Sequence, residues 1–459
     1  MKERMEAGEV LNNVKTCSSP SELRITDIRF ADIWNAPMHC ILVKVFTNQG
    51  LVGYGEVRDF ADKRYALMLK SKLIGENPCN VDRIFRKMKQ FGGLSRQAGG
   101  VCGIELALWD LAGKAYGVPV YQMLGGKFRD EIRCYCDTDV EGKNSGKKMG
   151  EALKKRMEKG FTMLKMDLSI SLLYDVPGAL SAPLGFIDKL REAEDCDEIM
   201  WKQGTLDERY HMNRVREVQN IEHGMTAVQI TQKGLEYLDQ YMSDVRSVIG
   251  YEIPLAIDHI GHIGLTECIK LGRMLEKYNI AWLEDALPWH YTKQYAILKQ
   301  SVNVPICTGE DIYLKEGFRP LLEAGGVSVI HPDLLTSGGV LENKKIGDMA
   351  QEYGVAMAVH MAESPVACLA AVHSVAATEN FLALEFHSND VPWWDDLVIG
   401  TRKPLIQNGY IKVPDAPGLG IEGLVDDVIR EHIDNEKIPG LWEATDDWNN
   451  SYSHDRLWS

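Results

Sequence analysis

Three short apolar runs decide the fold of this chain, and each ends in a carboxylate: Leu255-Ala-Ile-Asp258, Ala281-Trp-Leu-Glu284 and Ile306-Cys-Thr-Gly-Glu310. The acidic residues follow one another at intervals of 26 residues. One strand with its crossover helix and loops takes about that length, so the pattern predicts consecutive βα units of a parallel sheet. All three carboxylates then project from the same end of neighbouring strands, the end that carries catalytic groups in a closed (β/α) barrel.

Further apolar strands alternate with helical spacing on both sides of this stretch, at 162–167, 327–330, 356–359 and 382–385. The main part of the chain is therefore expected to be α/β. The interval between Asp167 and Leu255 is much longer than one unit, which indicates an insertion near residues 169–222. Whether that insertion is a lid, an interface arm or an elaborated loop stays open.

The N-terminal part has a different pattern. Strand-like alternation over 25–30, 39–47 and 51–56 predicts a β meander, and helical spacing follows over 61–91 and 103–116. We expect an α+β unit over residues 20–135 and the α/β unit over 136–390. Residues 391–459 form a C-terminal segment, whose tryptophans are expected to pack on a neighbouring surface.

Composition excludes several classes of function. The net charge is −15 and the acidic excess is spread along the chain, which argues against a nucleic-acid partner. No run of 18 apolar residues occurs and the N-terminus does not resemble a signal sequence, so we expect a soluble, cytoplasmic protein with no membrane partner. The ten cysteines include no CxxC pair, which predicts neither a disulfide framework nor a metal bound by sulfur.

The three carboxylates at the strand ends predict a metal site. Converging without a counterion, they would repel one another strongly. Carboxylate oxygens, completed by water and substrate, are how proteins hold Mg²⁺. Asp258, Glu284 and Glu310 are therefore the predicted Mg²⁺ ligands. The alternative is that each carboxylate only caps the helix that follows its strand.

A similar spacing along the sequence continues from Glu310 through Asp333, His360 and Glu385. An Asp at the end of the adjacent strand can orient the imidazole and raise its basicity, so His360 is the predicted base and Asp333 its partner. Lys165 and Asp167 share one face of their strand and are predicted to point into the barrel. Lys165 is expected to be a second acid or base, or a cation that holds the substrate carboxylate.

A set of motifs covers nearly the whole chain outside the insertion and the ends: Leu51-Val-Gly-Tyr-Gly-Glu56, Gly103-Ile-Glu-Leu-Ala-Leu-Trp-Asp-Leu-Ala-Gly-Lys114, Leu124-Gly-Gly126, Trp282-Leu-Glu-Asp285, Thr308-Gly-Glu310, His331-Pro-Asp333 with Ser337-Gly-Gly339, Val359-His360 and Glu385-Phe-His-Ser-Asn389. In this order they resemble the enolase superfamily, and within it the mandelate racemase subgroup (mandelate racemase/muconate lactonizing enzyme-like). Residues 406–422 are similar to the closing segment of the acid-sugar dehydratases of that subgroup.

The resemblance implies a (β/α)7β TIM-like barrel under an N-terminal α+β capping domain that the C-terminal segment completes. It also implies that Mg²⁺ chelates the substrate carboxylate and stabilises the enediolate left when the α-proton departs. Lys165 and a protonated Glu385 would be further donors, and for this Glu385 needs a raised pKa. A symmetric homo-oligomer, an octamer or a dimer, is expected.

One departure from the subgroup decides between reactions. Its racemases carry Lys-x-Lys where this chain has Lys165-Met-Asp167, and racemisation needs a base on each face of the carbanion. Elimination needs one base and one acid, and His360 can serve as both. We therefore expect dehydration of an aldonate-like sugar acid to a 2-keto-3-deoxy acid. An epimerase or cycloisomerase is the alternative, and a non-catalytic sugar-acid-binding relative is a third, against which the intact ligand set and base pair count.

Substrate contacts are predicted at positions where the chain departs from its relatives or where N-terminal loops face the barrel. Several dehydratases of the family carry His or Asn two residues after the first metal ligand, where this chain has Ile260 between two histidines. The residue two before Asp333 is often Gln in relatives and is His here. The predicted substrate contacts are His39, Arg96, His259, His262 and His331.

Overall fold

The structure, a computed structural model, describes residues 18–142, 144–203, 210–222, 224–258, 263–433 and 441–451. Its main part is a closed barrel in which each strand pairs in parallel with the next, and the last strand pairs with the first. The barrel strands are β4 Glu131–Cys136, β5 Leu164–Asp167, β8 Leu255–Asp258, β9 Leu283–Glu284, β10 Ile306–Thr308, β11 Val329–Ile330, β12 Ala356–Val359 and β13 Phe381–Phe386.

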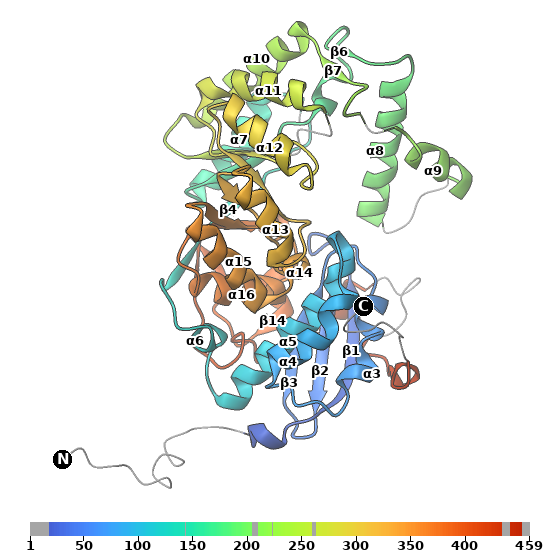
Figure 1. The fold of residues 1–459 in the computed structure, drawn as a ribbon, viewed down its shortest axis with the longest axis vertical. Coiled ribbons are helices and arrows are strands. Elements are labelled where there is room, and N and C mark those ends of the chain that lie inside the picture. The colour runs from blue at the N-terminus through green and yellow to red at the C-terminus, as the bar shows by residue number, and fades with distance from the viewer. Residues whose placement is uncertain are drawn as a thin grey trace, which may run out of the picture.

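Helices follow the strands in turn and surround the barrel (Figure 1). They are α7 Gly146–Glu158, α10 Gln232–Ile249, α11 Leu265–Leu275, α12 Thr292–Ser301, α13 Leu314–Glu323, α14 Leu334–Ser337, α15 Val340–Glu352 and α16 Pro365–Ala376. A small core of side chains such as Tyr135, Trp282 and Cys307 fills the inside of the barrel. The larger core lies between the strands and the helices and continues into the N-terminal domain.

The N-terminal domain contains an antiparallel meander, β1 Ile25–Ile33, β2 Cys40–Thr47 and β3 Val52–Val57. Its helices are α2 Arg64–Leu67, α3 Lys70–Leu73, α4 Val81–Met88, α5 Gly99–Tyr116 and α6 Val120–Met123. Helix α5 packs on β3 so closely that a Cβ atom on Gly55 would lie 2.0 Å from the carbonyl oxygen of Gly103. Two contacts join this domain to the barrel unit: helix α5 contacts α14, and strand β3 contacts α16.

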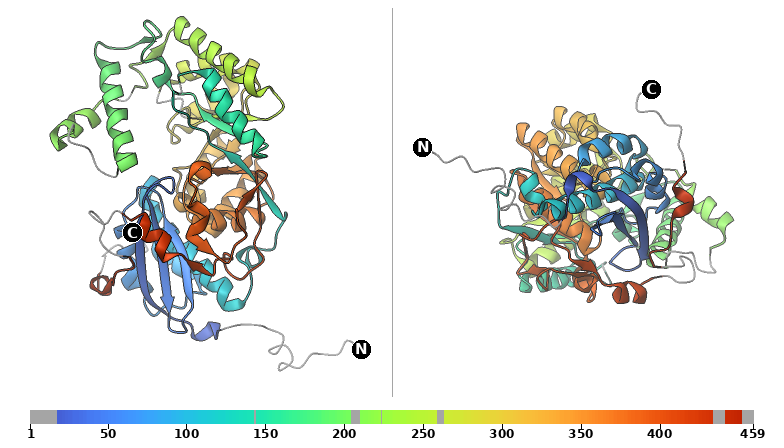
Figure 2. Two further views of the ribbon diagram at one scale, coloured as in Figure 1. Left: turned by 180° about the vertical axis from the view of Figure 1, so that it is seen from behind. Right: turned by 90° about the horizontal axis from the view of Figure 1, so that it is seen from below.

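The C-terminal segment completes both units. Strands β15 Ile406–Gln407 and β16 Tyr410–Lys412 extend the barrel sheet beside β4, and β14 Val398–Ile399 pairs with β17 Gly423–Leu424. After α17 Asp426–Glu431 the chain returns to the first sheet, where the amide of Trp442 donates to the carbonyl of Phe30 at 3.2 Å. Figure 2 shows this segment lying over the N-terminal sheet. Trp458 lies outside the described residues.

The insertion leaves the barrel after β5 and returns at α10. It contains β6 Leu180–Ser181, α8 Phe186–Gln203, α9 Met212–Gln219 and β7 Gln229–Ile230. Strands β6 and β7 pair antiparallel and close its base. Helices α8 and α9 stand out from the barrel on the side where the N-terminal domain lies (Figure 1).

Short 3-10 turns lie at several connections: η1 Pro20–Glu22, η2 Lys89–Phe91, η3 Ser95–Ala98, η4 Ile170–Leu173, η5 Glu276–Tyr278, η6 Ser388–Asp390, η7 Trp394–Leu397 and η8 Asp446–Trp448. In the described parts of the chain, no helix has both the length and the apolar character that crossing a lipid bilayer requires.

The predicted fold class is confirmed: a (β/α)7β barrel with an N-terminal α+β domain that the C-terminal segment completes. The boundary between the two units is corrected. Strand β4 begins at Glu131, before the predicted barrel start at residue 136. Its alternation of charged and buried residues also fits a last strand of the N-terminal unit, and only its pairing with β5 and β13 assigns it to the barrel.

Candidate active site

Carboxylates gather at the carboxyl ends of three successive barrel strands, as predicted. Asp258 is the last residue of β8 and Glu284 the last of β9, and both are buried. Glu310 follows β10 by two residues, with 14% of its side chain exposed. These ends lie on the same side of the barrel because the strands are parallel.

A fourth carboxylate, Asp285, was not predicted. Burial raises the pKa of Asp285 well above its usual value, and the charges of Glu310, Asp258 and Glu284 raise it further. Its backbone has a φ of 45°, which an Asp adopts more readily than most residues and which turns the chain sharply after β9. The sequence signal was present in the motif Trp282-Leu-Glu-Asp285, but the spacing of 26 residues does not relate this residue to the other carboxylates.

Lys165 lies at the centre of the carboxylates. Its Nζ contacts Asp258 and lies 2.8 Å from Glu284 Oε1 and 2.8 Å from Glu385 Oε1. Burial lowers the pKa of Lys165, but these three charges outweigh burial and raise it well above the usual value. Lys165 is therefore a buried ammonium that holds carboxylates together. Asp167, at the end of the same strand, is exposed.

His360 and Asp333 form the predicted pair. Nδ1 of His360 lies 2.6 Å from Oδ2 of Asp333, and Nε2 lies 3.2 Å from Oε2 of Glu310. Burial lowers the pKa of His360, but the charge of Glu310 and the hydrogen bond to Asp333 raise it to about 9. Asp333 engages Nδ1, and the other ring nitrogen, Nε2, faces the carboxylate cluster.

Arg58 reaches this pair from the N-terminal domain, and sequence reasoning missed it. Its Nη1 lies 2.5 Å from Asp333 Oδ2 and 2.7 Å from Glu363 Oε1, and its Nε lies 3.0 Å from Asp59. Burial raises the pKa of Asp333, but Arg58 and then His360 outweigh burial and lower it, so this carboxylate is ionised. The only sequence signal was a charged pair directly after an apolar strand.

The expectation that Glu385 is protonated is wrong. Burial does raise its pKa, but Lys165, His387 and His331 outweigh burial and lower the pKa well below the usual value. The physical reason is that the other carboxylates are not its nearest neighbours. An ammonium and two imidazoles surround it, so Glu385 is charged.

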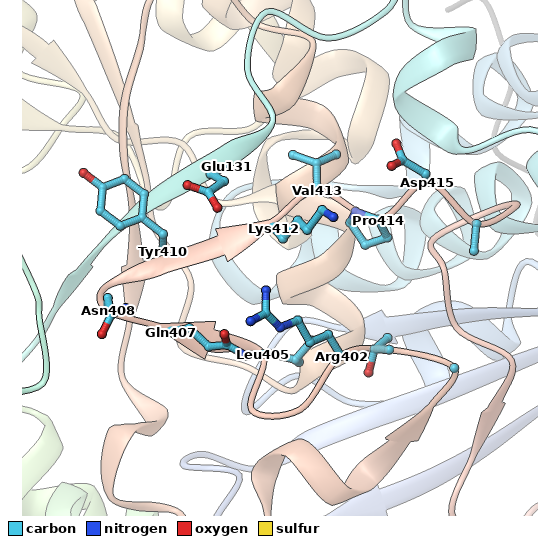
Figure 3. A pocket seen from close by; sticks show the side chains of 13 residues that line it. Glu131, Arg402, Leu405, Gln407, Asn408, Tyr410, Lys412, Val413, Pro414 and Asp415 are labelled. Atoms are coloured by element: carbon cyan, nitrogen blue, oxygen red, sulfur yellow. The ribbon is translucent and has the colours of Figure 1, made fainter.

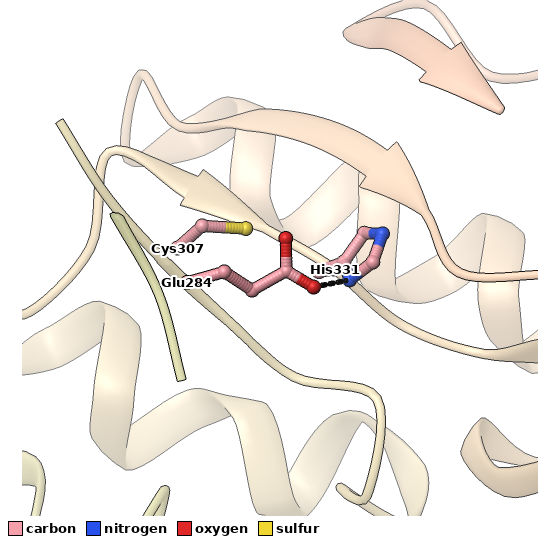
Figure 4. Close-up of side chains that lie close together, drawn as sticks. All are labelled: Glu284, Cys307 and His331. Atoms are coloured by element: carbon pink, nitrogen blue, oxygen red, sulfur yellow. Dashed lines mark ion pairs between the residues drawn. The ribbon is translucent and has the colours of Figure 1, made fainter. Parts of the chain in front are cut away.

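His331 does not occupy the predicted position of a substrate contact. It is completely buried inside the barrel, with Nδ1 2.8 Å from Glu284 and Nε2 3.3 Å from Glu385. The Tyr135 hydroxyl lies 2.5 Å from the same Nε2. Figure 4 shows His331 beside Glu284 and the Cys307 thiol. Both ring nitrogens face protein groups, so His331 supports the carboxylates from within the barrel.

The remaining predicted substrate contacts lie at the rim or outside the described residues. Arg96 lies beside the site, with Nη2 3.0 Å from Asp59 and Nη1 3.4 Å from Asp311, which follows Glu310. His39 is buried in the N-terminal domain, 3.2 Å from Asp32 and stacked on Trp34. Contacts of these two residues with substrate stay predictions. His259 and His262 lie outside the described residues.

A separate cavity of about 430 Å³ lies at the other end of the barrel (Figure 3). Its lining includes Glu131, the first residue of β4, together with Arg402 and Lys412 from the C-terminal segment. None of the clustered carboxylates lines this cavity. It therefore has no part in the chemistry described above.

Comparisons with known proteins agree with this geometry. Residues 17–125 match the N-terminal domain of mandelate racemase / muconate lactonizing enzyme, and residues 213–427 match the enolase C-terminal domain-like family. The chain is 33% identical over 426 residues to a D-xylonate dehydratase of Haloferax volcanii, with 91% of each protein covered. It is 27% identical over 410 residues to a D-galactonate dehydratase of Ralstonia pickettii, covering 87% of this chain and 91% of that protein.

Among solved structures, a mandelate racemase/muconate lactonizing enzyme-like protein of Rubrobacter xylanophilus matches with a TM-score of 0.74 and 29% identity, over 90% of this chain and 98% of that one. The motifs, the closed barrel and the two domain matches agree with one another. The chain therefore belongs to the enolase superfamily, in its mandelate racemase/muconate lactonizing enzyme group.

Proposed function

We propose that the protein is a Mg²⁺-dependent dehydratase of sugar acids, which removes the α-proton and eliminates the β-hydroxyl to give a 2-keto-3-deoxy acid. The observation that carries this proposal is the His360–Asp333 pair, whose second ring nitrogen, Nε2, lies 3.2 Å from Glu310 at the carboxylate cluster. The names of the two dehydratase relatives support it, since each is similar to this chain over most of its length.

The donor set fits Mg²⁺. Asp258, Glu284 and Glu310 offer hard carboxylate oxygens at adjacent strand ends, the ligand type that this ion prefers. The raised pKa of Asp285 reflects the concentration of negative charge at the same place. When bound, the ion would supply positive charge to the substrate carboxylate and to the enediolate that forms from it.

The other roles in the reaction fall to side chains of the protein itself. Asp333 engages Nδ1 of His360, so Nε2 is the nitrogen that can exchange a proton with the substrate, and the ring serves as a general base in the form that has lost the Nε2 proton. Arg58 keeps Asp333 ionised. The ammonium of Lys165 adds positive charge beside Glu385 and the ligands, where it stabilises negative charge that develops on the substrate.

The contacts of Lys165 also disfavour the epimerase alternative. A second base needs a nitrogen that can take a proton from the substrate, and three carboxylates engage the Nζ of Lys165. Lys165 is therefore placed to supply positive charge rather than to take a proton, which suits elimination better than proton transfer on both faces.

The experiment is to incubate the full chain with Mg²⁺ and a library of aldonic and aldaric acids in deuterated water. Keto acid formation and α-deuteration are read together, for the wild type and for His360→Asn. We expect keto acid from the wild type only. Deuteration without keto acid from the wild type would instead identify an epimerase, and keto acid from His360→Asn would remove His360 as the base.

A further inference from the structure

A second histidine–aspartate pair lies at the seam where the barrel closes. Phe386 of β13 pairs with Cys136 of β4, so the next residues, His387 and Asp137, are neighbours at the carboxyl ends of adjacent strands. The amide of Asp137 donates to the carbonyl of Phe386 at 3.2 Å, which holds this register. His387 directly follows β13 and is two residues beyond Glu385.

The contacts of His387 resemble those of His360. Nδ1 lies 3.4 Å from Asp137 Oδ2, and Nε2 lies 3.2 Å from Glu385 Oε1. Its ring centre is 5.8 Å from that of His360. The side chain is 17% exposed, whereas Glu385 is completely buried, so His387 lies nearer to the opening. Nε2 is itself buried and makes no hydrogen bond of normal geometry with a described residue.

Elimination needs an acid as well as a base, because hydroxide is a poor leaving group until it is protonated. Lys165 is engaged by three carboxylates, and Glu385 is ionised. Nε2 of His360 takes the α-proton under the proposed function. His387 has a nitrogen without a hydrogen-bond partner of normal geometry in the described part of the site, and a carboxylate that orients its ring.

We propose that His387, held by Asp137, is the general acid that protonates the departing β-hydroxyl, while His360 serves as the base. This inference rests on the proposed dehydratase function and assigns the second proton transfer to a separate residue. Two imidazoles with centres 5.8 Å apart can each reach one substituent on two adjacent carbon atoms.

The step balances without any further reactant. His360 takes the proton on C2, and the electron pair of that C–H bond moves into the C1=C2 bond of the enediolate. As the carboxylate forms again, that pair becomes the C2=C3 double bond. The C3–O bond breaks, its electron pair stays on oxygen, and the proton from Nε2 of His387 converts the leaving group to water. The enol product then gains a proton at C3 and loses its hydroxyl proton, which gives the 2-keto-3-deoxy acid.

The charges around His387 suit a proton donor. Burial lowers its pKa, but Asp137 and then Glu385 outweigh burial, while His360 acts in the opposite direction, and the pKa is raised overall. The ring thus holds a proton more strongly than an exposed histidine does, as a general acid requires.

The test compares His387→Asn with the wild type on a sugar acid that the wild type dehydrates. We expect keto acid formation to fall by about 10²–10⁴-fold, the usual contribution of a positioned acid. Exchange of the α-proton with deuterated solvent should persist, because His360 is intact and the enediolate returns to substrate. His360→Asn should lose both reactions, and His211→Asn, on an exposed histidine of the insertion, should keep both.

A β-chloro analogue of the same acid provides the second measurement. Chloride leaves without a proton, so His387→Asn should eliminate chloride at a rate close to that of the wild type. Asp137→Asn should show the same pattern with a smaller loss of dehydration, because Asp137 only positions the imidazole ring of His387.

Two results would overturn the assignment: normal dehydration by His387→Asn, or loss of both exchange and chloride elimination in a variant whose thermal unfolding is unchanged. Both differ from a failure of the proposed function, in which the wild type itself forms no keto acid.

Discussion

The guanidinium of Arg58, at the end of the N-terminal sheet, lies 2.5 Å from Oδ2 of Asp333 in the barrel. The same oxygen lies 2.6 Å from Nδ1 of His360. The carboxylate that holds His360 is therefore shared between the two domains, because Arg58 contacts it from the N-terminal domain.

Replacing Arg58 should cost both stability and activity. Arg58→Ala leaves Asp333 buried without its counterion and Glu363 without a hydrogen-bond donor, and breaking such a network typically costs about 3–5 kcal/mol. We expect a lower urea midpoint and a lower kcat, with partial recovery of kcat on adding guanidinium. Arg64→Ala, at an exposed arginine paired with Asp62, should change neither. Wild-type kcat in Arg58→Ala would contradict the shared role.

Removing the ammonium from the carboxylate cluster should tighten Mg²⁺ binding while it abolishes activity. Lys165 contacts Asp258 and Glu284, so its charge opposes that of a cation held by the same oxygens. Lys165→Met should bind Mg²⁺ more tightly in calorimetric titration and form no keto acid. Weaker binding than in the wild type would mean that Lys165 is needed to keep the carboxylates in place.

Glu105 should make the protein less stable as the pH rises. It accepts from the amide of Val340 at 2.8 Å at the start of α15, and burial raises its pKa from 4.5 to about 8 despite this bond. At a pH between 4.5, the usual pKa, and about 8, the pKa in the folded protein, the folded chain binds more protons than the unfolded chain. The contribution of Glu105 to the free energy of unfolding is complete below about pH 4.5 and is lost as the pH rises through about 8.

Glu105→Gln should therefore flatten the fall of unfolding free energy between pH 5 and 8, where one proton accounts for at most about 1.4 kcal/mol per pH unit. Part of the slope should remain, because burial also raises the pKa of Glu56 to about 7. Urea unfolding at several pH values measures the slope, and Glu323→Gln, at an exposed position, is the control. Equal slopes in Glu105→Gln and the wild type would show that Glu105 does not titrate in this range.

The contact between α5 and β3 should tolerate no added methyl group. A Cβ atom on Gly103 would lie 2.5 Å from the carbonyl oxygen of Glu56, a backbone atom that cannot move alone. We expect Gly103→Ala to lower the unfolding free energy by roughly 1–3 kcal/mol, as overpacking usually does. Gly317→Ala in α13 meets only a methyl group of Ile312 and should cost less. Thermal unfolding of the two variants compares them directly.

The sequence by itself determined the barrel and most of the chemistry at its end. The intervals that separate Asp258, Glu284 and Glu310 are local, and parallel strands bring their ends to one side whatever the details of packing. The pairing of Asp333 with His360 follows from the same spacing, because the two residues lie just beyond the ends of adjacent parallel strands.

Only the tertiary structure decided which groups surround these residues. Arg58 reaches the base pair from another domain, and Asp137 meets His387 only because the barrel closes between β13 and β4. The ionisation of Glu385 was predicted wrongly for the same reason. A pKa depends on the charges that lie within a few ångströms in space, and the ammonium of Lys165 comes from a strand far away in the chain. Periodicity shows where a strand ends, whereas the neighbours of that end are set by packing.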